Sequence, residues 1–453
     1  MSSERYLVRG AQLSDGTTTD LLLADGVITG AGTRLSDAGA TVIDADGLIA
    51  LPGLVDLHTH LREPGYEQSE TVLTGSQAAA IGGFTTVFAM ANTSPVQDTA
   101  GVVEQVLALG ESAGYVTVQP IGAVTVGLAG ERLAELGAMA ASRANVRVFS
   151  DDGFCVSDPL LMRRALEYVK AFDGVVAQHS QEPRLTVGAQ MNEGALSSEL
   201  GLTGWPAVAE ESIIARDVLL AEHVGSRLHV CHLSTAGAVD VVRWAKARGI
   251  NVTAEVTPHH LLLTEELVAG YDARYKVNPP LRRREDVEAL RQGLADGTID
   301  IIATDHAPHP VEAKDCEWDA AANGMVGLES ALSVAHAAVV ETGFLDWKDL
   351  VRVMSTTPAR IGRIQGQGQQ LTVGAPAELT LYDPSARRVF GRSNLIGKGV
   401  NSPYLEMSLP GQVLATFHRG YATVLDGVLQ STAQIDAARA ALAAGRTGAG
   451  RNE

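Results

Sequence analysis

The sequence predicts an α/β protein, a (β/α)8 TIM-type barrel with a small β-sandwich domain formed from both chain ends. Three observations support this prediction. Short β-branched runs alternate with Ala-rich helical stretches through the middle of the chain, as in βα units around a parallel sheet. Strand-like runs bounded by turn residues occupy both ends. The length of 453 residues accommodates a barrel of ~250 residues with insertions and a smaller unit.

Both chain ends have the residue pattern of a β domain. Runs at 6–9, 20–24 and 26–29 are bounded by Asp-Gly or Ala-Gly pairs, which are turn signals. Similar runs occur at 377–383, 413–417 and 422–429, after a Gln-Gly-rich segment typical of a linker. We therefore expect residues 1–52 and 369–453 to form the β-sandwich domain, with a helical tail from about Ala437, and residues 53–368 to form the barrel.

The middle of the chain contains eight strand candidates, separated by helices of which the clearest cover 71–81, 159–172 and 236–248. A doubly wound sheet is the alternative architecture. It would normally carry a Gly-rich phosphate loop after an early strand, and the sequence has no G-x-G-x-x-G or P-loop pattern. The barrel is therefore favoured. Its expected strands are 54–58, 85–89, 116–121, 146–150, 175–179, 228–232, 251–255 and 299–305.

Composition restricts the classes of partner. The chain has 35 Lys and Arg against 53 Asp and Glu, a formal net charge of −18. This charge argues against nucleic acids and acidic membranes, which require clustered basic residues, and leaves small-molecule substrates open. Three cysteines, Cys155, Cys231 and Cys316, suit free thiols in a reducing compartment. With neither a signal-peptide core nor a run of ~18 apolar residues, a cytoplasmic location is expected.

Polar residues follow the expected strands. Because strand carboxyl ends share one face of a barrel, these side chains should converge there. His58 and His60, at i and i+2, should point to the same side and address one ion. A lone His-x-His is as often a solvated loop, but recurrence at equivalent strand ends makes coincidence a poor explanation. The residues at these positions are His58, His60, Asn92, Asp151, Asp152, His179, His232, Asp305 and His309.

Four histidines and two aspartates exceed the needs of one catalytic zinc, which usually takes three protein ligands. They suit two ions ~3.5–4 Å apart, bridged by a carboxylate and a hydroxide. We assign His58, His60 and Asp305 to one metal, and His179 and His232 to the other. Asp152 is the favoured bridge, with Asp151 as a capping or supporting group.

Other polar residues are expected to have structural roles. His259 and His260 are expected to pack or to support the ligands rather than to bind metal. His229 and Cys231 are expected in the core. The run Arg282-Arg283-Arg284 is typical of a solvated helix start.

Several motifs of the sequence resemble those of known protein families. Pro52-Gly-Leu-Val-Asp-Leu-His-Thr-His resembles the first-strand signature of the amidohydrolase superfamily of metal-dependent hydrolases. Leu61-Arg-Glu-Pro-Gly, Met90-Ala-Asn-Thr-Ser-Pro, Lys276-Val-Asn-Pro-Pro-Leu-Arg and Ala303-Thr-Asp-His-Ala-Pro-His are similar to those of dihydroorotases. The similarity covers essentially the whole chain and is closest to the longer bacterial form, class I.

The resemblance implies two Zn2+ ions per subunit, bridged by Asp152 and a hydroxide, with the six ligands assigned above. Asp305 would be the catalytic proton shuttle. The implied substrate-binding residues are His60, Arg62, Asn92, Asn278, His309, Asn323 and Gly324.

Two positions distinguish this chain from relatives. Hydantoinases, allantoinases and the other dihydroorotase type bridge their metals with a carboxylated lysine, whereas here the fourth strand runs into Asp151-Asp152 without a lysine. Asn323 stands where Pro or a bulky apolar residue is expected, which leaves the details of its loop open.

The expected activity is reversible cyclisation of N-carbamoyl-L-aspartate to (S)-dihydroorotate in pyrimidine biosynthesis. The alternatives are another cyclic amidase, such as an allantoinase or dihydropyrimidinase, or a scaffold partner of aspartate carbamoyltransferase. Arg62 favours the first, because it requires a substrate carboxylate that allantoin and plain dihydropyrimidines lack. We expect a homo-oligomer, and association with aspartate carbamoyltransferase is left open.

Overall fold

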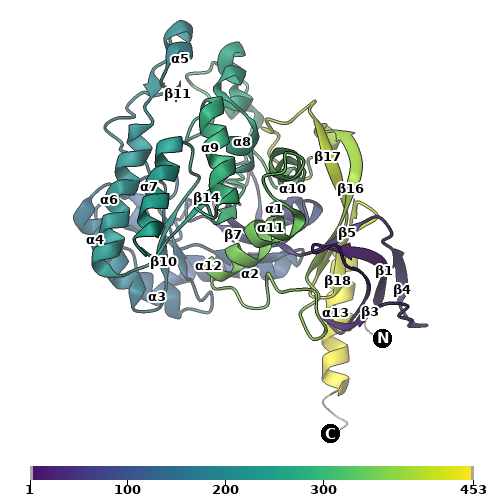
Figure 1. The fold of residues 1–453 in the computed structure, drawn as a ribbon. Coiled ribbons are helices and arrows are strands. Elements are labelled where there is room, and N and C mark those ends of the chain that lie inside the picture. The colour runs from purple at the N-terminus through teal and green to yellow at the C-terminus, as the bar shows by residue number, and fades with distance from the viewer. Residues whose placement is uncertain (1–3, 450–453) are drawn as a thin grey trace.

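The computed structural model describes residues 4–449 and has an α/β fold (Figure 1). All eight strands expected in the middle of the chain are present, although several are shorter than the sequence predicted. They are β6 (Leu54–Thr59), β7 (Phe84–Ala89), β8 (Thr117–Pro120), β9 (Val148–Phe149), β10 (Val175–Gln178), β13 (Leu228–Val230), β14 (Val252–Val256) and β15 (Ile301–Ile302).

These eight strands pair in parallel within two sheets, in the orders β6-β7-β8 and β15-β14-β13-β10-β9. Isolated parallel bridges join the sheets at both sides, between Thr59 and His306 and between Gly122 and Phe149. The carboxyl ends of all eight strands therefore lie at one side. The closed (β/α)8 barrel itself stays a prediction, because the ladder is not continuous across these two junctions.

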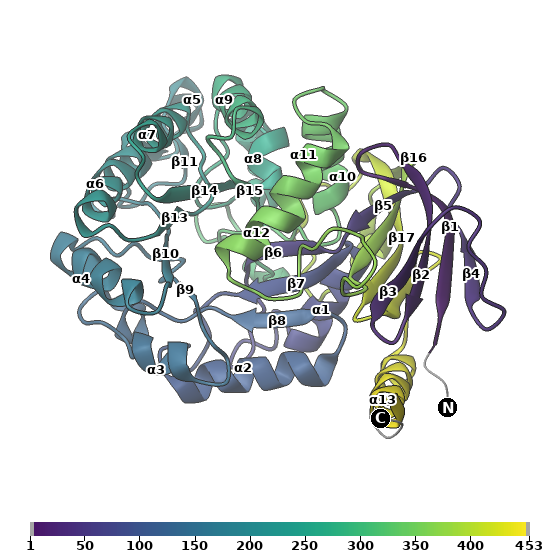
Figure 2. The ribbon, with the colours of Figure 1, turned by 60° about the horizontal axis from the view of Figure 1, so that its bottom comes forward.

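Helices surround the strands, and Figure 2 shows α2, α3, α4, α6, α7 and α9 in an arc outside them. Helix α4 illustrates why they form. Asp158 caps its first turn by accepting from the Leu161 amide at 2.8 Å, and Pro159 occupies its first position, where no amide donor is needed. Apolar residues at intervals of three and four face the strands. The helices are α1 (Val72–Ile81), α2 (Ala100–Ala113), α3 (Leu136–Ala141), α4 (Pro159–Lys170), α6 (Val208–Val224), α7 (Ala236–Ala247) and α9 (Arg284–Ala295).

A short excursion, unexpected from the sequence, separates β10 from α6. It contains β11 (Met191–Asn192), α5 (Ala195–Leu200) and β12 (Gly204–Trp205), and it lies beyond the strand ends in Figure 1. Further short helices follow β14 and β15, namely α8 (Pro258–Leu262), α10 (Ala331–Ala335), α11 (Trp347–Val351) and α12 (Thr357–Ile361).

Both chain ends contribute to one nine-stranded sheet beside the helices (Figure 2). The two halves meet where β5 pairs antiparallel with β16, and a shared core combines residues such as Val8 and Leu21 with Leu379 and Phe417. A β domain from both ends is thus present, and its description as a sandwich stays a prediction. Its strands are β1 (Tyr6–Leu13), β2 (Thr18–Ala24), β3 (Val27–Gly32), β4 (Thr41–Asp44), β5 (Ile49–Pro52), β16 (Leu379–Val389), β17 (Ser408–His418), β18 (Tyr421–Leu425) and β19 (Val428–Leu429).

The expected C-terminal helix is α13 (Thr432–Ala449), which begins earlier than the sequence suggested. Its Ile435 is fully buried, and Arg439 donates to the carbonyl of Glu111 at 2.7 Å. No helix within residues 4–449 has both the length and the apolarity of a membrane span.

Candidate active site

The strand ends bring together the six side chains that the sequence analysis grouped as metal ligands. All six are buried, although they come from segments up to 247 residues apart (58 to 305). Their nitrogen and oxygen atoms form two sets that share Asp152. The first set contains His58, His60, Asp152 and Asp305, and the second contains Asp152, His179 and His232.

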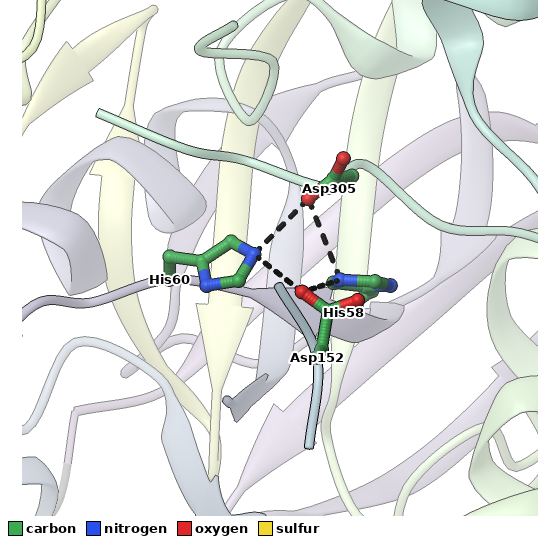
Figure 3. Close-up of side chains that lie close together, drawn as sticks. All are labelled: His58, His60, Asp152 and Asp305. Carbon is green, nitrogen blue, oxygen red and sulfur yellow. Dashed lines mark hydrogen bonds and ion pairs between the residues drawn. The ribbon is translucent and has the colours of Figure 1, made fainter. Parts of the chain in front are cut away.

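The first set is compact (Figure 3). Nε2 of His58 and Nε2 of His60 each lie 3.3 Å from Oδ2 of Asp152. The same two nitrogens lie 3.4 Å and 3.1 Å from Oδ1 of Asp305. Two imidazoles and two carboxylate oxygens therefore face one point, as the i, i+2 spacing of the histidines predicted.

The second set uses the other oxygen of Asp152. Its Oδ1 lies 3.3 Å from Nδ1 of His179 and 3.3 Å from Nε2 of His232. These two ring nitrogens are 2.9 Å apart. Asp152 thus directs one carboxylate oxygen to each set, which is the position that a bridging ligand occupies.

The electrostatics of the cluster favour cations. Burial alone would raise the pKa of Asp152, but the charge of His58 and hydrogen bonds from His179 and His232 outweigh it and hold this pKa well below its ordinary value. Asp305 behaves in the same way: burial raises its pKa, but His58 and His60 lower it by more, and the resulting pKa is about 2. Two ionised carboxylates are therefore buried side by side.

Backbone conformation at the site is unusual. Arg62, His232 and Asp305 have φ values of 63°, 30° and 49°, in the left-handed region that residues with a Cβ rarely adopt. Strained residues of this kind persist where surrounding structure holds them, and they concentrate at functional sites. In each case the residue lies two or three positions after a strand.

Three of the four histidines are also held through their outward ring nitrogen. His60 Nδ1 lies 2.9 Å from Oδ1 of Asn92, and His58 Nδ1 lies 2.5 Å from Oε1 of Glu255. His179 Nε2 lies 2.9 Å from Oε1 of Gln181. Such partners fix the tautomer and orientation of a metal-binding imidazole.

The expected substrate residues lie around this cluster and are mostly half-buried. Oε1 of Gln181, the partner of His179, also accepts from Nδ2 of Asn278 at 3.0 Å. Asn278 is therefore linked to His179 through Gln181, whereas Asn92 contacts the ring of His60 directly. Arg62 Nε donates to the carbonyl of Pro308 at 3.2 Å. Burial lowers the pKa of this guanidinium to about 10, which leaves it charged at neutral pH.

His309 contacts the loop around Gly324. Its Nε2 donates to the carbonyl of Asn323 at 2.8 Å. Burial, together with the charges of Arg62 and Lys314, lowers the pKa of His309 to about 3, so the ring is neutral. Gly324 has φ +136°, and a Cβ there would lie 2.9 Å from Nε2 of His309, so a side chain would clash at this position. Asn323 is exposed, and its backbone carbonyl is the acceptor in this contact with His309.

Several residues are placed outside the cluster. Asp151 accepts from the amides of Val124 and Thr125 at 2.8 and 2.9 Å and so caps the neighbouring segment. His259 and His260 are buried, and neither belongs to the metal-binding sets found among the described residues. Nδ1 of His260 lies 2.8 Å from the hydroxyl of Thr257 instead.

Four residues at or near the site were not recognised from the sequence. Glu255 lies at the end of an expected strand, but no function was predicted for it. Gln181 lies two residues after His179. Asn401 donates to the carbonyls of Ala307 and Gly324 at 2.9 and 3.1 Å, which ties the two loops together. Arg282, expected in solvent, is only 1% exposed.

The donor set fits a pair of divalent cations. Nε2 of His58 is buried and has no hydrogen-bond partner within the part of the chain that the structure describes. The facing nitrogens of His179 and His232, together with one oxygen of Asp152, form a second group that could hold a metal ion. Imidazole and carboxylate ligands of this number and type suit Zn2+.

Comparisons with known proteins indicate the family of this chain. The family model described as Dihydro-orotase-like matches residues 47–238. A dihydroorotase of Leifsonia xyli is 81% identical over 95% of this chain and 99% of the relative, and one of Streptomyces coelicolor is 66% identical over 94% and 99%. The structure of an L-hydantoinase (dihydropyrimidinase) from Arthrobacter aurescens superimposes with a TM-score of 0.83, at 26% identity, over 95% of this chain and 98% of that chain.

A parallel α/β fold with buried histidines and aspartates at its strand ends defines a protein of the amidohydrolase superfamily. Within that superfamily, the chain belongs to the dihydroorotase family.

Proposed function

We propose that this protein is a zinc-dependent dihydroorotase, which interconverts N-carbamoyl-L-aspartate and (S)-dihydroorotate plus water in pyrimidine biosynthesis. The observation that carries the proposal is the pair of His/Asp sets sharing Asp152, with Arg62 and His309 beside them. The curated relatives support the same activity. Those at 81% and 66% identity are dihydroorotases, and the similarity to this chain covers nearly their full length.

In this proposal His58, His60 and Asp305 would hold one Zn2+, His179 and His232 would hold another, and Asp152 would be a ligand shared by both. Zinc in such a pair supplies Lewis-acid polarisation of a carbonyl oxygen and lowers the pKa of water toward neutrality. The protein contributes a buried, preorganised set of ligands whose outward nitrogens are already hydrogen-bonded.

Asp305 moves the proton. Its carboxylate is ionised, because the neighbouring imidazoles outweigh the effect of burial on its pKa. In hydrolysis, water adds to the ring carbonyl and Asp305 takes up the proton that is released. Asp305 then gives this proton to the ring nitrogen as the C–N bond breaks. In the biosynthetic direction the same carboxylate removes the proton from the ureido nitrogen as the C–N bond forms, and returns it to the departing hydroxyl, which leaves as water.

Arg62 binds the substrate carboxylate. The guanidinium stays charged despite its burial, and two parallel N–H donors match a carboxylate bidentately. Asn92 and His309 complete the grip on this anion, with the single N–H of the neutral His309 ring transferring from the Asn323 carbonyl to the substrate carboxylate. Asn278 donates to the edge of the ring. The backbone of Asn323 and Gly324 covers the substrate.

A second candidate function is hydrolysis of another cyclic amide, and the TM-score of 0.83 with the L-hydantoinase favours it. Two features argue for dihydroorotate. Arg62 requires an anionic substrate, and Asp152 stands where a carboxylated lysine bridges the metals of hydantoinases.

One experiment separates these functions. Purified protein is assayed with dihydroorotate and with hydantoin, before and after treatment with a chelator, and again after addition of Zn2+. We expect turnover of dihydroorotate that is lost with the chelator and restored by Zn2+, and little turnover of hydantoin. Equal or faster turnover of hydantoin would contradict the proposal.

The proposal also includes a closed (β/α)8 barrel, a β-sandwich domain and a homo-oligomer. The bridges at Thr59–His306 and Gly122–Phe149 support closure, since they join the two parallel sheets at both sides. Light scattering of the purified protein tests the oligomer, which a monomeric mass of 47.5 kDa would exclude.

A further inference from the structure

A buried carboxylate lies directly behind the proposed metal ligands. Glu255, on β14, is 1% exposed and has an imidazole on each of its oxygens. Oε1 lies 2.5 Å from Nδ1 of His58, and Oε2 lies 3.0 Å from Nε2 of His229. Oε1 also accepts from the backbone amide of His232 at 3.3 Å. One side chain thus contacts a residue of each metal-binding set.

The hydrogen bonds of Glu255 fix the tautomer of His58. Oε1 of Glu255 lies 2.5 Å from Nδ1 of His58 and also accepts from the backbone amide of His232. A carboxylate oxygen paired with N–H groups is the acceptor, so the proton of the neutral His58 ring lies on Nδ1. Nε2, which faces Asp152 and Asp305, then presents its lone pair to a cation.

His229 holds Glu255 from the opposite side. Its Nε2 donates to Oε2, and its Nδ1 lies 2.8 Å from the hydroxyl of Thr253. The two strands set this contact, because His229 on β13 pairs in register with Thr253 on β14. A continuous row of hydrogen bonds therefore runs from Thr253 through His229 and Glu255 to His58.

This group is a support and not a third metal site. Cys231, His58 and Glu255 do offer a possible ligand set, but Nδ1 and Oε1 are 2.5 Å apart, a hydrogen-bond length that leaves no room for a cation between them.

We propose that Glu255, held by His229, is a positioning residue that keeps His58 in its cation-binding tautomer and thereby strengthens Zn2+ binding. This inference rests on the proposed function, because it assumes that His58 binds metal. Carboxylate partners of metal-bound histidines orient the ring and raise its basicity, and their loss typically weakens metal affinity ~10–100-fold. Glu255 would also offset part of the charge of the bound cations.

The test is Zn2+ affinity rather than turnover. Metal is removed from the full-length protein, circular dichroism checks that it stays folded, and Zn2+ is titrated in competition with a chromophoric chelator. We expect Glu255→Gln to weaken Zn2+ binding ~10–100-fold, since glutamine keeps the size but loses the charge. His229→Asn, which removes only the second support, should weaken binding less, in the same direction.

Glu378→Gln is the matched control. Glu378 also forms a buried pair with a histidine, His418, at 2.9 Å, but this pair lies away from the proposed ligands. Its variant should bind Zn2+ as the unchanged protein does. Unchanged affinity in both Glu255→Gln and His229→Asn, even with lowered thermal stability, would overturn the inference. Failure of the unchanged protein to bind Zn2+ would instead overturn the proposed metal centre.

Discussion

Oδ1 of Asp305 lies 3.1 Å from Nε2 of His60, although 245 residues separate the two in the chain. Isolated parallel pairing between Thr59 and His306 brings their segments together. The contact places an ionised carboxylate at the centre of the proposed site, where it can both bind metal and carry a proton.

The first prediction concerns this proton transfer. Asp305→Asn keeps the size of the side chain but cannot act as a base, so kcat with dihydroorotate should fall at least ~100-fold. Steady-state assays in both reaction directions measure it, and circular dichroism verifies the fold. Asp315→Asn, an exposed substitution in the following loop, serves as control. A kcat near that of the unchanged protein would refute the role of Asp305.

Asp152 is expected to control how many metal ions are bound. Its two carboxylate oxygens face different histidine pairs, so Asp152→Ala should reduce the Zn2+ content below two ions per chain. Elemental analysis of the purified variant measures this content. Asp151→Asn, which alters the adjacent carboxylate that caps backbone amides, should leave it unchanged. Two fully retained ions in Asp152→Ala would rule out the bridge.

The convergence of these residues could be anticipated because it depends on a simple rule. Parallel strands that alternate with helices end on one side, so a polar residue after each strand is placed near the others. His58, Asp152, His179, His232 and Asp305 each follow or end such a strand, and the structure brings them together. Their function as ligands stays a prediction.

The supporting contacts could not be anticipated, because they depend on packing between distant segments. Gln181 meets Asn278 across 97 residues. Arg282 was misjudged for a related reason. Its charge run suggested solvent, but its guanidinium donates to Asn192 and to the carbonyl of Trp205. Both belong to the β11–β12 excursion, which no periodicity in the sequence revealed.

A third prediction concerns recognition of the substrate anion. Removing the charge in Arg62→Met should raise KM for dihydroorotate ~10–100-fold, the range expected for hydrogen bonds to a charged group, with a smaller effect on kcat. Arg62→Lys should recover only part of the loss, because an ammonium cannot bind a carboxylate bidentately. Steady-state kinetics of both variants test this. An unchanged KM in Arg62→Met would assign the carboxylate to another residue.

The last prediction uses Lys314, whose ammonium donates to the carbonyls of Lys276 and Ala322 at 3.1 and 2.7 Å beside the substrate loop. Burial, reinforced by the charge of Lys276, lowers its pKa from 10.5 to about 7. Below pH 7 the side chain is charged in both the folded and unfolded states, so the full cost of burying the charge is present. Between pH 7 and 10.5 the unfolded chain binds more protons, so the contribution of Lys314 to the free energy of unfolding rises with pH.

Lys314→Met removes this titration. The stability of the unchanged protein relative to Lys314→Met should therefore increase from pH 7 to pH 9.5, as measured by urea denaturation at matched ionic strength. Lys348→Met, at an exposed lysine on α11, should show a difference that does not change with pH. A constant difference for Lys314→Met as well would mean that the buried lysine keeps its ordinary pKa and remains charged beside His309.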